Sequence, residues 1–307
     1  MAHGGSLRVG AVQHRMVAQR EHNWATTERL LRQLAVAQVD VAVLPELHSH
    51  EYIARLMRAE TFSQAEPIPG PTSNKLSDWA STLGMVIVGS VFEKREDGVF
   101  HNTALVYDRD GSLAGMYRKM HIPYDPGFFE KFYFSPGEGT AENSFRPVQT
   151  SVGAIGVLVC WDQWFPEAAR LMTLAGADIL VYPSAIGTAP VEPAVTVEQE
   201  RDAWITVQRG HSIANLIPVV ATNRVGVERS FDSEDEGIRF WGSSFITGPM
   251  GELLAQGSGD TEGVIVADLS LRRMRELRQQ WPFFRDRRPD VYGDIQRPWR
   301  DARDLPG

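Results

Sequence analysis

Short apolar runs of strand length alternate along this chain with longer segments of helical periodicity. Residues 7–13 and 39–44 are apolar runs with the length of buried strands. Between them, residues 24–37 carry Leu30 and Leu34 at the spacing of one helix face. Strands that alternate with helices favour an α/β fold, in which helices cover the faces of a sheet.

The rest of the chain continues this pattern. Further helices are predicted from the N-cap Thr72 to residue 83, near 198–215 and at 271–280. Further strands are predicted at 85–92, 101–107, 113–117, 178–183, 218–224, 240–247, 252–255 and 263–268. An Asp/Gly turn at 108–111 predicts a hairpin. Since neither a linker nor a repeat divides the chain, we expect one domain in which a mixed sheet or two sheets are covered by helices.

Composition narrows the class of protein. The 307 residues are 43% hydrophobic and 23% charged, as in globular proteins, and the net charge of −8 argues against nucleic-acid binding. No apolar run has the length of a membrane span, and residues 1–8 lack the apolar core of a secretory signal. A single cysteine cannot form an intramolecular disulfide. We therefore expect a cytoplasmic protein that binds neither nucleic acid nor a membrane.

That single cysteine, Cys160, lies between an apolar run and an amphipathic one. Residues 151–170 are typical of a strand, a tight turn and a helix. A thiol at such a junction stands at the edge of a sheet, where it can face a pocket and where the following amides can point at a developing negative charge. Cys160 is therefore a candidate nucleophile, although buried, inert thiols are common.

A cysteine nucleophile needs a proton acceptor and an oxyanion stabiliser. None of the eight histidines has a spacing that specifies a Cys–His pair. Glu46 follows a predicted strand at the carboxyl end, where ligand sites of α/β sheets form, and is a candidate base. Lys119 closes another strand and opens the irregular, Pro/Gly/aromatic-rich segment 118–150, which is typical of a functional loop. Glu130 lies in that segment among aromatic residues, and its burial would require a partner.

Together these segments resemble a known family. The strings PEL at 45–47, YRKMHIP at 117–123, EKFYFSPG at 130–137 and CWDQWFPE at 160–167 resemble, in order and spacing, the motif blocks of the nitrilase superfamily of carbon–nitrogen hydrolases. The resemblance runs from about residue 7 to about residue 268. Within it, the strings at 130–134, 160–170 and 182–187 are most similar to the N-carbamoylputrescine amidase branch.

The resemblance implies an α-β-β-α sandwich, classed as α/β or as a four-layer α+β fold, over 1–307 with a C-terminal helix and a Pro/Arg-rich tail at 271–307. It implies Cys160 as nucleophile, Glu46 as general base, Lys119 as oxyanion stabiliser and Glu130 as a group that positions the substrate or tunes Lys119. It also implies a small-molecule substrate and a homo-oligomer, a dimer or larger, that needs no metal and no organic cofactor. We further expect Cys160 beside Lys119 to have a depressed pKa.

The residues expected to bind substrate or its oxyanion are Trp161, Asp125, Tyr52 and Ala185, with the Trp161 backbone N–H as a second oxyanion donor. Two positions depart from the branch. An acidic residue expected after the block at 182–187 is replaced by Ala189, and residues 124–127 differ from the usual loop. A cationic substrate tail would therefore need another carboxylate. The candidates are Asp125, Glu192 and Glu51.

Several alternatives remain at this point. A carboxylate-bearing ureide, as in a β-ureidopropionase or N-carbamoyl amino acid amidohydrolase, would need a cation such as Arg201 or Arg209. A true nitrilase is disfavoured by the amidase-like context at 161–164. A papain-like thiol hydrolase would need an essential histidine, for which His121 is the candidate. A non-catalytic interaction module is disfavoured because Glu46, Lys119, Glu130 and Cys160 occur together. The leading hypothesis is hydrolysis of an N-carbamoyl amine.

Overall fold

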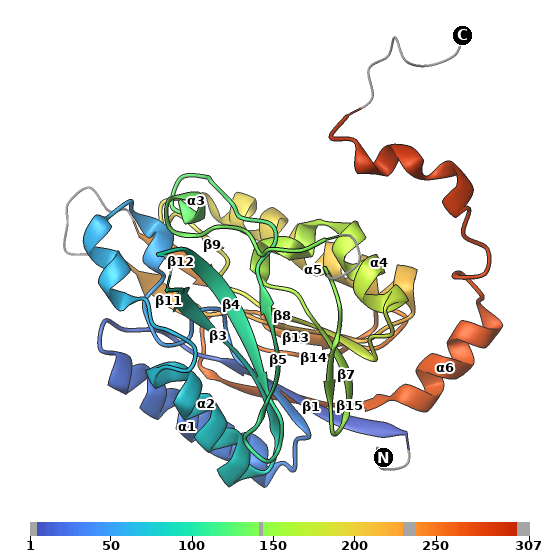
Figure 1. Cartoon of the computed structure of the whole chain (residues 1–307), viewed down its shortest axis with the longest axis horizontal. Coiled ribbons are helices and arrows are strands. Elements are labelled where there is room, and N and C mark those ends of the chain that lie inside the picture. Colours follow the sequence, from blue (N-terminus) through green and yellow to red (C-terminus); the bar gives the residue numbers. More distant parts are fainter. Residues whose placement is uncertain (1–4, 97, 141–143, 230–236, 300–307) are drawn as a thin grey trace.

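The computed structural model describes residues 5–96, 98–140, 144–229 and 237–299. Two six-stranded sheets stack face to face, and helices cover their outer faces, so the chain is an α-β-β-α sandwich (Figure 1). A smaller, three-stranded sheet lies beside them. Buried residues of both large sheets, among them Val41 and Val43 on one and Val181 and Val219 on the other, form one hydrophobic core. The predicted fold class is therefore confirmed.

The first large sheet has the order β15-β1-β2-β3-β4-β5. Strands β1, β2 and β3 are parallel to one another, and β15, β4 and β5 join by antiparallel pairing. Side chains alternate between its faces: Val41 and Val43 face the central core, whereas Ala42 faces the helices. Its strands are β1 (Ser6–Gln13), β2 (Val41–Val43), β3 (Val86–Lys94), β4 (Phe100–Tyr107), β5 (Leu113–Arg118) and β15 (Gly263–Ser270).

The second large sheet has the order β14-β13-β10-β8-β7-β6, with parallel pairing of β7, β8 and β10. Its strands are β6 (Val148–Thr150), β7 (Gly153–Val157), β8 (Ile179–Pro183), β10 (Val219–Thr222), β13 (Phe245–Thr247) and β14 (Leu253–Gln256). The small sheet consists of β9 (Gly187–Thr188), β11 (Val225–Glu228) and β12 (Ile238–Trp241).

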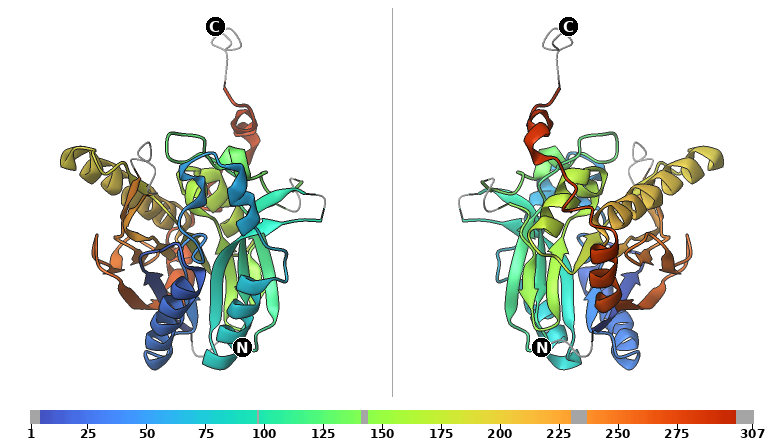
Figure 2. Two further views of the ribbon diagram at one scale, coloured as in Figure 1. Left: turned by 90° about the vertical axis from the view of Figure 1, so that its left-hand side faces the viewer. Right: turned by 90° about the vertical axis from the view of Figure 1, so that its right-hand side faces the viewer.

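Helices α1 and α2 cover the first sheet, and α4 and α5 lie against the second (Figures 1 and 2). Leu30, Leu31 and Leu34 of α1 are fully buried against the sheet, as their spacing predicts. The helices are α1 (Arg20–Val36), α2 (Pro71–Leu83), α3 (Glu130–Tyr133), α4 (Pro166–Leu174), α5 (Ala194–Asn215) and α6 (Leu271–Gln280), with 3₁₀ helices η1 (Ile53–Arg55), η2 (Ala59–Gln64), η3 (Cys160–Trp164), η4 (Pro289–Val291) and η5 (Gly293–Gln296).

Most predicted elements are present, but several boundaries differ. The predicted strand 240–247 is two strands in different sheets, because Gly242 and Ser243 both have positive φ, at 54°, and turn the chain between β12 and β13. Thr72 is not an N-cap: Gly70 occupies that position and Pro71 opens α2. The segment expected to be irregular, 118–150, contains the short helix α3 and the strand β6.

Three of the candidate catalytic side chains lie just beyond the carboxyl ends of strands. Glu46 follows β2, Lys119 follows β5 and Cys160 follows β7. The first two strands run in the same direction in one sheet, because β5 is related to β3 through two antiparallel pairings. Their carboxyl ends therefore meet at one edge of the sandwich, as expected for ligand sites in such sheets.

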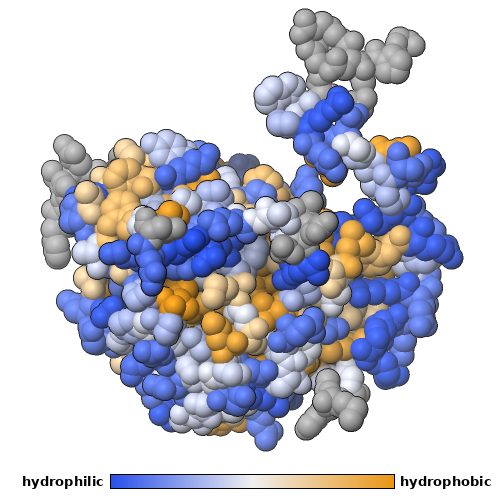
Figure 3. Space-filling view, viewed as in Figure 1, coloured by the Kyte–Doolittle hydropathy of each residue, from blue (hydrophilic) through white to orange (hydrophobic). Residues whose placement is uncertain are grey.

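The surface on the face drawn in Figure 3 is mostly hydrophilic, with apolar residues in separate small patches. In the described part of the chain, no helix is both long enough and apolar enough to cross a membrane. After α6 the chain leaves the sandwich and runs through η4 and η5 (Figures 1 and 2). Residues 300–307 of the predicted Pro/Arg-rich tail lie outside the described residues.

Candidate active site

Glu46 is fully buried beyond the end of β2. Its Oε1 atom accepts hydrogen bonds from Lys119 Nζ at 2.9 Å and from Asn102 Nδ2 at 2.6 Å. The other oxygen, Oε2, is buried and has no hydrogen-bond partner among the described residues. A buried carboxylate oxygen without a donor is poised to accept a proton, because the rest of the carboxylate is already held in place.

Lys119 is fully buried between two carboxylates. Besides its bond to Glu46, Nζ donates to Glu130 Oε1 at 2.9 Å and to Oε2 at 2.7 Å. Burial alone would lower the pKa of Lys119, but the charges of Glu130 and Glu46 outweigh burial and raise the pKa above its ordinary value. The side chain is therefore a permanent ammonium inside the protein.

Glu130 opens the short helix α3 and is fully buried, as the surrounding aromatic residues predict. Tyr52 donates a hydrogen bond from its hydroxyl to Glu130 Oε1 at 2.6 Å. Burial raises the pKa of Glu130 to about 7, and Glu46 acts in the same direction, while Lys119 and Tyr52 oppose the rise. This carboxyl therefore changes its charge near neutral pH.

Cys160 is the first residue of η3 and has a φ of 44°, a conformation that is uncommon for a residue other than glycine. Its Sγ atom donates to the Ala185 carbonyl at 3.9 Å. The buried carboxylate of Asp162 holds the turn, because Oδ2 accepts from Val159 N at 2.8 Å and from the Tyr117 hydroxyl at 2.9 Å. The predicted elbow is present, with a 3₁₀ turn between the strand and helix α4.

The expected depression of the Cys160 pKa is wrong. Burial raises the pKa of this thiol well above its ordinary value, and the charge of Glu46 raises it further. Lys119 lowers the pKa, but Glu130 adds to the rise, so the two carboxylates and burial outweigh the single ammonium. This candidate nucleophile is therefore a thiol at rest, and it would have to lose its proton in order to react.

His121, the candidate for a papain-like relay, contacts a different group. Its Nδ1 atom lies 2.6 Å from Asp162 Oδ1, and its ring stacks on Phe165 with centroids 3.8 Å apart. No histidine of the described residues forms a hydrogen bond with Cys160, whose Sγ contacts Ala185 instead. The geometry thus favours Glu46 over histidine as the base.

A cavity of about 530 Å³ leads from the surface to Cys160 and Glu130. Aromatic side chains form much of its wall: Tyr52, Phe128, Trp161, Trp164 and Trp241. The ionisable side chains nearer its mouth are acidic: Asp125, Glu192 and Glu200. Among its described lining residues there is no lysine, arginine or histidine. An aromatic wall with carboxylates suits an organic cation, which both features attract.

Only some of the residues predicted to bind substrate line this cavity. Tyr52, Asp125, Trp161 and Glu192 line it, as does Ala189. Ala185 is not a lining residue and faces the site only through its carbonyl group, which accepts from the thiol. The predicted cations Arg201 and Arg209 do not line the cavity, and Arg209 instead donates to the Gly251 carbonyl at 2.8 Å.

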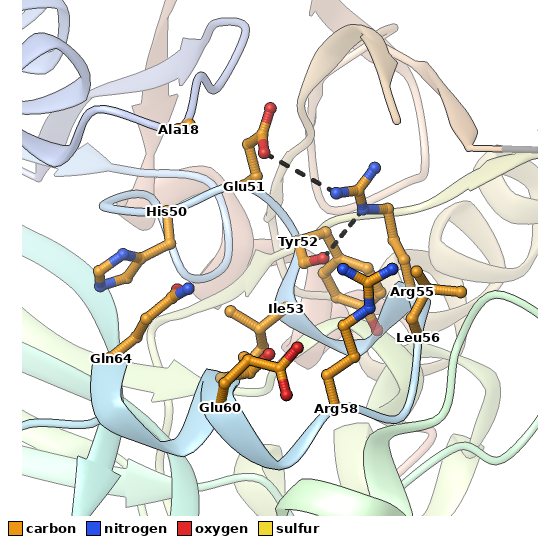
Figure 4. Close-up of a pocket in the computed structure, with 11 residues that line it drawn as sticks. Ala18, His50, Glu51, Tyr52, Ile53, Arg55, Leu56, Arg58, Glu60 and Gln64 are labelled. Carbon is orange, nitrogen blue, oxygen red and sulfur yellow. Dashed lines mark hydrogen bonds and ion pairs between the residues drawn. The ribbon is translucent and has the colours of Figure 1, made fainter. Parts of the chain in front are cut away.

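Glu51 belongs to a second cavity, of about 270 Å³, which among the described residues shares only Tyr52 with the lining of the first (Figure 4). There it pairs with Arg55 at 3.8 Å. The lining of this cavity does not include Cys160, Lys119 or Glu130, so it is separate from the candidate active site.

Asn102 and Glu200 are among the residues at the site that the sequence did not indicate. Asn102 holds Glu46, but an asparagine inside a predicted strand carries no signal of its own. Glu200 lines the cavity together with Ala203, and their spacing of three residues on the predicted helix is the signal that places them on one face. In the described residues, no group of three or more His, Cys, Asp or Glu side chains is arranged to hold a metal ion.

Comparison with known proteins agrees with this geometry. The family model for carbon–nitrogen hydrolases matches residues 8–279. The chain belongs to the carbon–nitrogen hydrolase family. This membership makes it an enzyme that cleaves carbon–nitrogen bonds, and it confirms the resemblance identified from the sequence motifs.

Individual relatives cover nearly the whole of this carbon–nitrogen hydrolase. It is 41% identical over 288 residues to the N-carbamoylputrescine amidase of Solanum lycopersicum, with 93% of each chain covered. It is 35% identical to the citrullinase of Francisella tularensis, with 96% of this chain and 99% of the relative covered. A crystal structure of a carbon–nitrogen hydrolase from Helicobacter pylori is 43% identical and superposes with a TM-score of 0.91 over 96% of this chain and 100% of that one.

Proposed function

We propose that this carbon–nitrogen hydrolase converts N-carbamoylputrescine to putrescine, carbon dioxide and ammonia, a step of polyamine biosynthesis. The observation that carries the proposal is the cavity above Cys160, whose ionisable mouth residues Asp125, Glu192 and Glu200 are all acidic. They would attract the ammonium group at the far end of the substrate. The similarity to N-carbamoylputrescine amidases supports the same substrate.

In the proposed mechanism, the buried side chains of Cys160, Glu46 and Lys119 act one after another. Cys160 Sγ attacks the carbamoyl carbon while Glu46 accepts the thiol proton. Lys119 Nζ and the backbone N–H of Trp161 stabilise the tetrahedral oxyanion; Trp161 is the second residue of η3, where N–H groups lack partners within the helix. Glu46 then gives the proton to the leaving nitrogen and activates water against the covalent thiocarbamate intermediate. Hydrolysis of that intermediate frees the thiol and gives a carbamate, which loses carbon dioxide and releases the second nitrogen.

Glu130 and Tyr52 have supporting roles in this scheme. Glu130 holds the Lys119 ammonium with both carboxylate oxygens, and Tyr52 fixes one of those oxygens. The Ala185 carbonyl orients the thiol before attack. Asp125 contributes to the acidic mouth. No step requires a metal or an organic cofactor.

Our first prediction concerns substrate choice. We expect kcat/KM to be on the order of 10²-fold higher for N-carbamoylputrescine than for N-carbamoyl-β-alanine, because replacing attraction by repulsion at the mouth changes the interaction energy by about 2–3 kcal/mol. The measurement is ammonia release from these two ureides and from citrulline. Glu200→Gln should raise KM for N-carbamoylputrescine several-fold with little change in kcat.

Asp202→Asn is the matched control, because it removes the same charge from the same helix at a residue that does not line the cavity. Clear turnover of N-carbamoyl-β-alanine with none of N-carbamoylputrescine would contradict the proposal and favour a β-ureidopropionase. Preference for citrulline would instead assign the activity of the Francisella tularensis relative.

The second prediction concerns pH. Because burial raises the pKa of Glu130 to about 7, we expect kcat to fall as the pH drops through about 7. Protonation neutralises Glu130 and leaves Lys119 with one anionic partner instead of two. The apparent pKa belongs to the interacting set of buried groups as a whole. The measurement is the kcat–pH profile of the wild type between about pH 5 and pH 9, compared with that of Glu130→Gln.

In Glu130→Gln, the titrating carboxyl is absent, and the acid limb of the profile should move to lower pH. An unchanged limb in this variant would show that another group controls the profile.

We also propose that the chain works as one catalytic domain with its core at about 7–268, that copies assemble into dimers or larger homo-oligomers, and that the enzyme is cytoplasmic. The family match over 8–279 supports one domain. Large apolar side chains exposed beyond α6, with Val291 at 62%, Ile295 at 64% and Trp299 at 78%, support coverage by another copy.

A further inference from the structure

A buried ion pair lies beneath the active site and is not one of the groups that react. Arg224, between β10 and β11, donates from Nη1 to Glu228 Oε1 at 2.8 Å. Both side chains are fully buried. A buried ion pair is weak evidence for stability, since desolvation opposes the attraction. Its remaining contacts therefore indicate what the pair does.

Arg224 contacts the backbone of the proposed base. Its Nη2 atom donates to the carbonyl oxygens of Glu46 and Leu47, both at 2.9 Å. Leu47 has a φ of 49°, which a leucine adopts only when its surroundings impose it. The Ser90 hydroxyl accepts from Leu47 N at 2.6 Å. Arg224 and Ser90 thus hold the turn that directs the Glu46 carboxylate toward Lys119.

Glu228 contacts the backbone of Tyr52, the residue whose hydroxyl donates to Glu130. Its Oε2 atom accepts from the backbone N of Tyr52 at 2.5 Å. On the other side of this residue, Arg55 Nε donates to the Tyr52 carbonyl at 3.3 Å (Figure 4). The main chain of Tyr52 is therefore held from both sides while its hydroxyl reaches Glu130 at 2.6 Å.

We propose that the Arg224–Glu228 pair is a positioning element for catalysis, which sets both carboxylates on either side of Lys119. Arg224 fixes the backbone of Glu46, and Glu228 fixes Tyr52, which orients Glu130. Arginine is required because its planar fork donates in several fixed directions, here to three acceptors, whereas lysine is a compact charge. The inference rests on the catalytic roles given under the proposed function.

Arg224→Lys and Glu228→Gln test this inference. Lysine retains the charge opposite Glu228 but not the fork, and glutamine cannot accept at both former carboxylate oxygens. Since a displacement of about 1 Å in an active site can lower the rate about 10²-fold, we expect kcat to fall on the order of 10²-fold in each variant, with KM within about threefold. Thermal melting establishes that each variant is folded.

Alkylation of Cys160 by iodoacetamide provides a second readout that does not depend on the natural substrate. Cys160 is the sole cysteine of the chain, so the reaction reports this site alone. If the pair positions the base, the alkylation rate should fall at least about tenfold in both variants, because Glu46 no longer accepts the thiol proton efficiently. This comparison holds even if the wild type hydrolyses a different ureide.

Arg109→Lys is the matched control. Arg109 pairs with Asp40 at the opposite end of β2, away from the Glu46 turn. The Arg109→Lys substitution should leave kcat and the alkylation rate unchanged. The inference is overturned if folded Arg224→Lys retains both rates within threefold of the wild type, or if Arg109→Lys loses them equally. If Arg224→Lys does not fold, Glu228→Gln decides by the same two rates.

Discussion

Cys160→Ala is expected to lower kcat on the order of 10⁶-fold, the size of effect seen when a hydrolase loses its nucleophile. No other thiol in the chain can replace it, because Cys160 is the only cysteine. The side chain lies at the inner end of the substrate cavity, with its Sγ facing the Ala185 carbonyl. Ammonia release at saturating N-carbamoylputrescine measures the loss.

The fold should survive this substitution. Alanine removes only a small buried group, and the backbone at Cys160 already has the positive φ of 44° in the wild type, so the same strain remains. We expect a melting temperature within a few degrees of the wild type. Cys160→Ser, which keeps the size and a hydroxyl, is the companion variant. Retained hydrolysis of any ureide by folded Cys160→Ala would refute the assignment of the nucleophile.

Lys119→Met is expected to damage both activity and stability. Loss of one oxyanion donor typically costs about 2.7–4 kcal/mol of transition-state stabilisation, equivalent to about 10²–10³ in kcat. The same change leaves Glu46 and Glu130 buried without their shared cation. Removing one partner from a buried ion pair destabilises a protein by about 3–5 kcal/mol. Steady-state kinetics and denaturant unfolding measure the two effects.

The stability loss of Lys119→Met should depend on pH. Glu130 already has a pKa raised to about 7, and loss of the ammonium raises it further. A carboxyl whose folded pKa lies above its unfolded value destabilises the folded protein at high pH. The loss of unfolding free energy in Lys119→Met, relative to the wild type, should therefore be small below about pH 4 and grow as the pH rises through about 7.

Lys131→Met is the control, because Lys131 is an exposed residue next to Glu130 in α3. It should change neither activity nor the pH dependence of stability. A folded Lys119→Met enzyme with wild-type kcat would remove Lys119 from the proposed oxyanion site.

The raised pKa of Cys160 bears on how the enzyme avoids side reactions. A thiol that stays protonated at rest reacts slowly with oxidants and electrophiles, since the thiolate is the reactive form. In the proposed mechanism, proton transfer to Glu46 then has to accompany attack on the substrate. Glu46 Oε2, buried and without a hydrogen-bond partner among the described residues, is the acceptor that this step requires.

Much of the fold follows from local patterns. The buried face of α1 is visible in the spacing of its leucines, and α6 has the predicted bounds 271–280. The strand 240–247 was predicted as one element because its apolar run is continuous, yet backbone turns at Gly242 and Ser243 divide it between two sheets. Apolar periodicity reports burial, and it does not report which sheet a residue joins.

The sequence by itself determined the family, the strands that end at Glu46, Lys119 and Cys160, and the acidic candidates Asp125 and Glu192, because these depend on motifs and short-range periodicity. Tertiary structure alone decided the contacts of Arg224 with Glu46 and Glu228, the place of Glu200 in the cavity and the direction of the Cys160 pKa shift. Each of these results depends on burial and on charges that lie far away along the chain, and only the stacking of the two sheets brings them together.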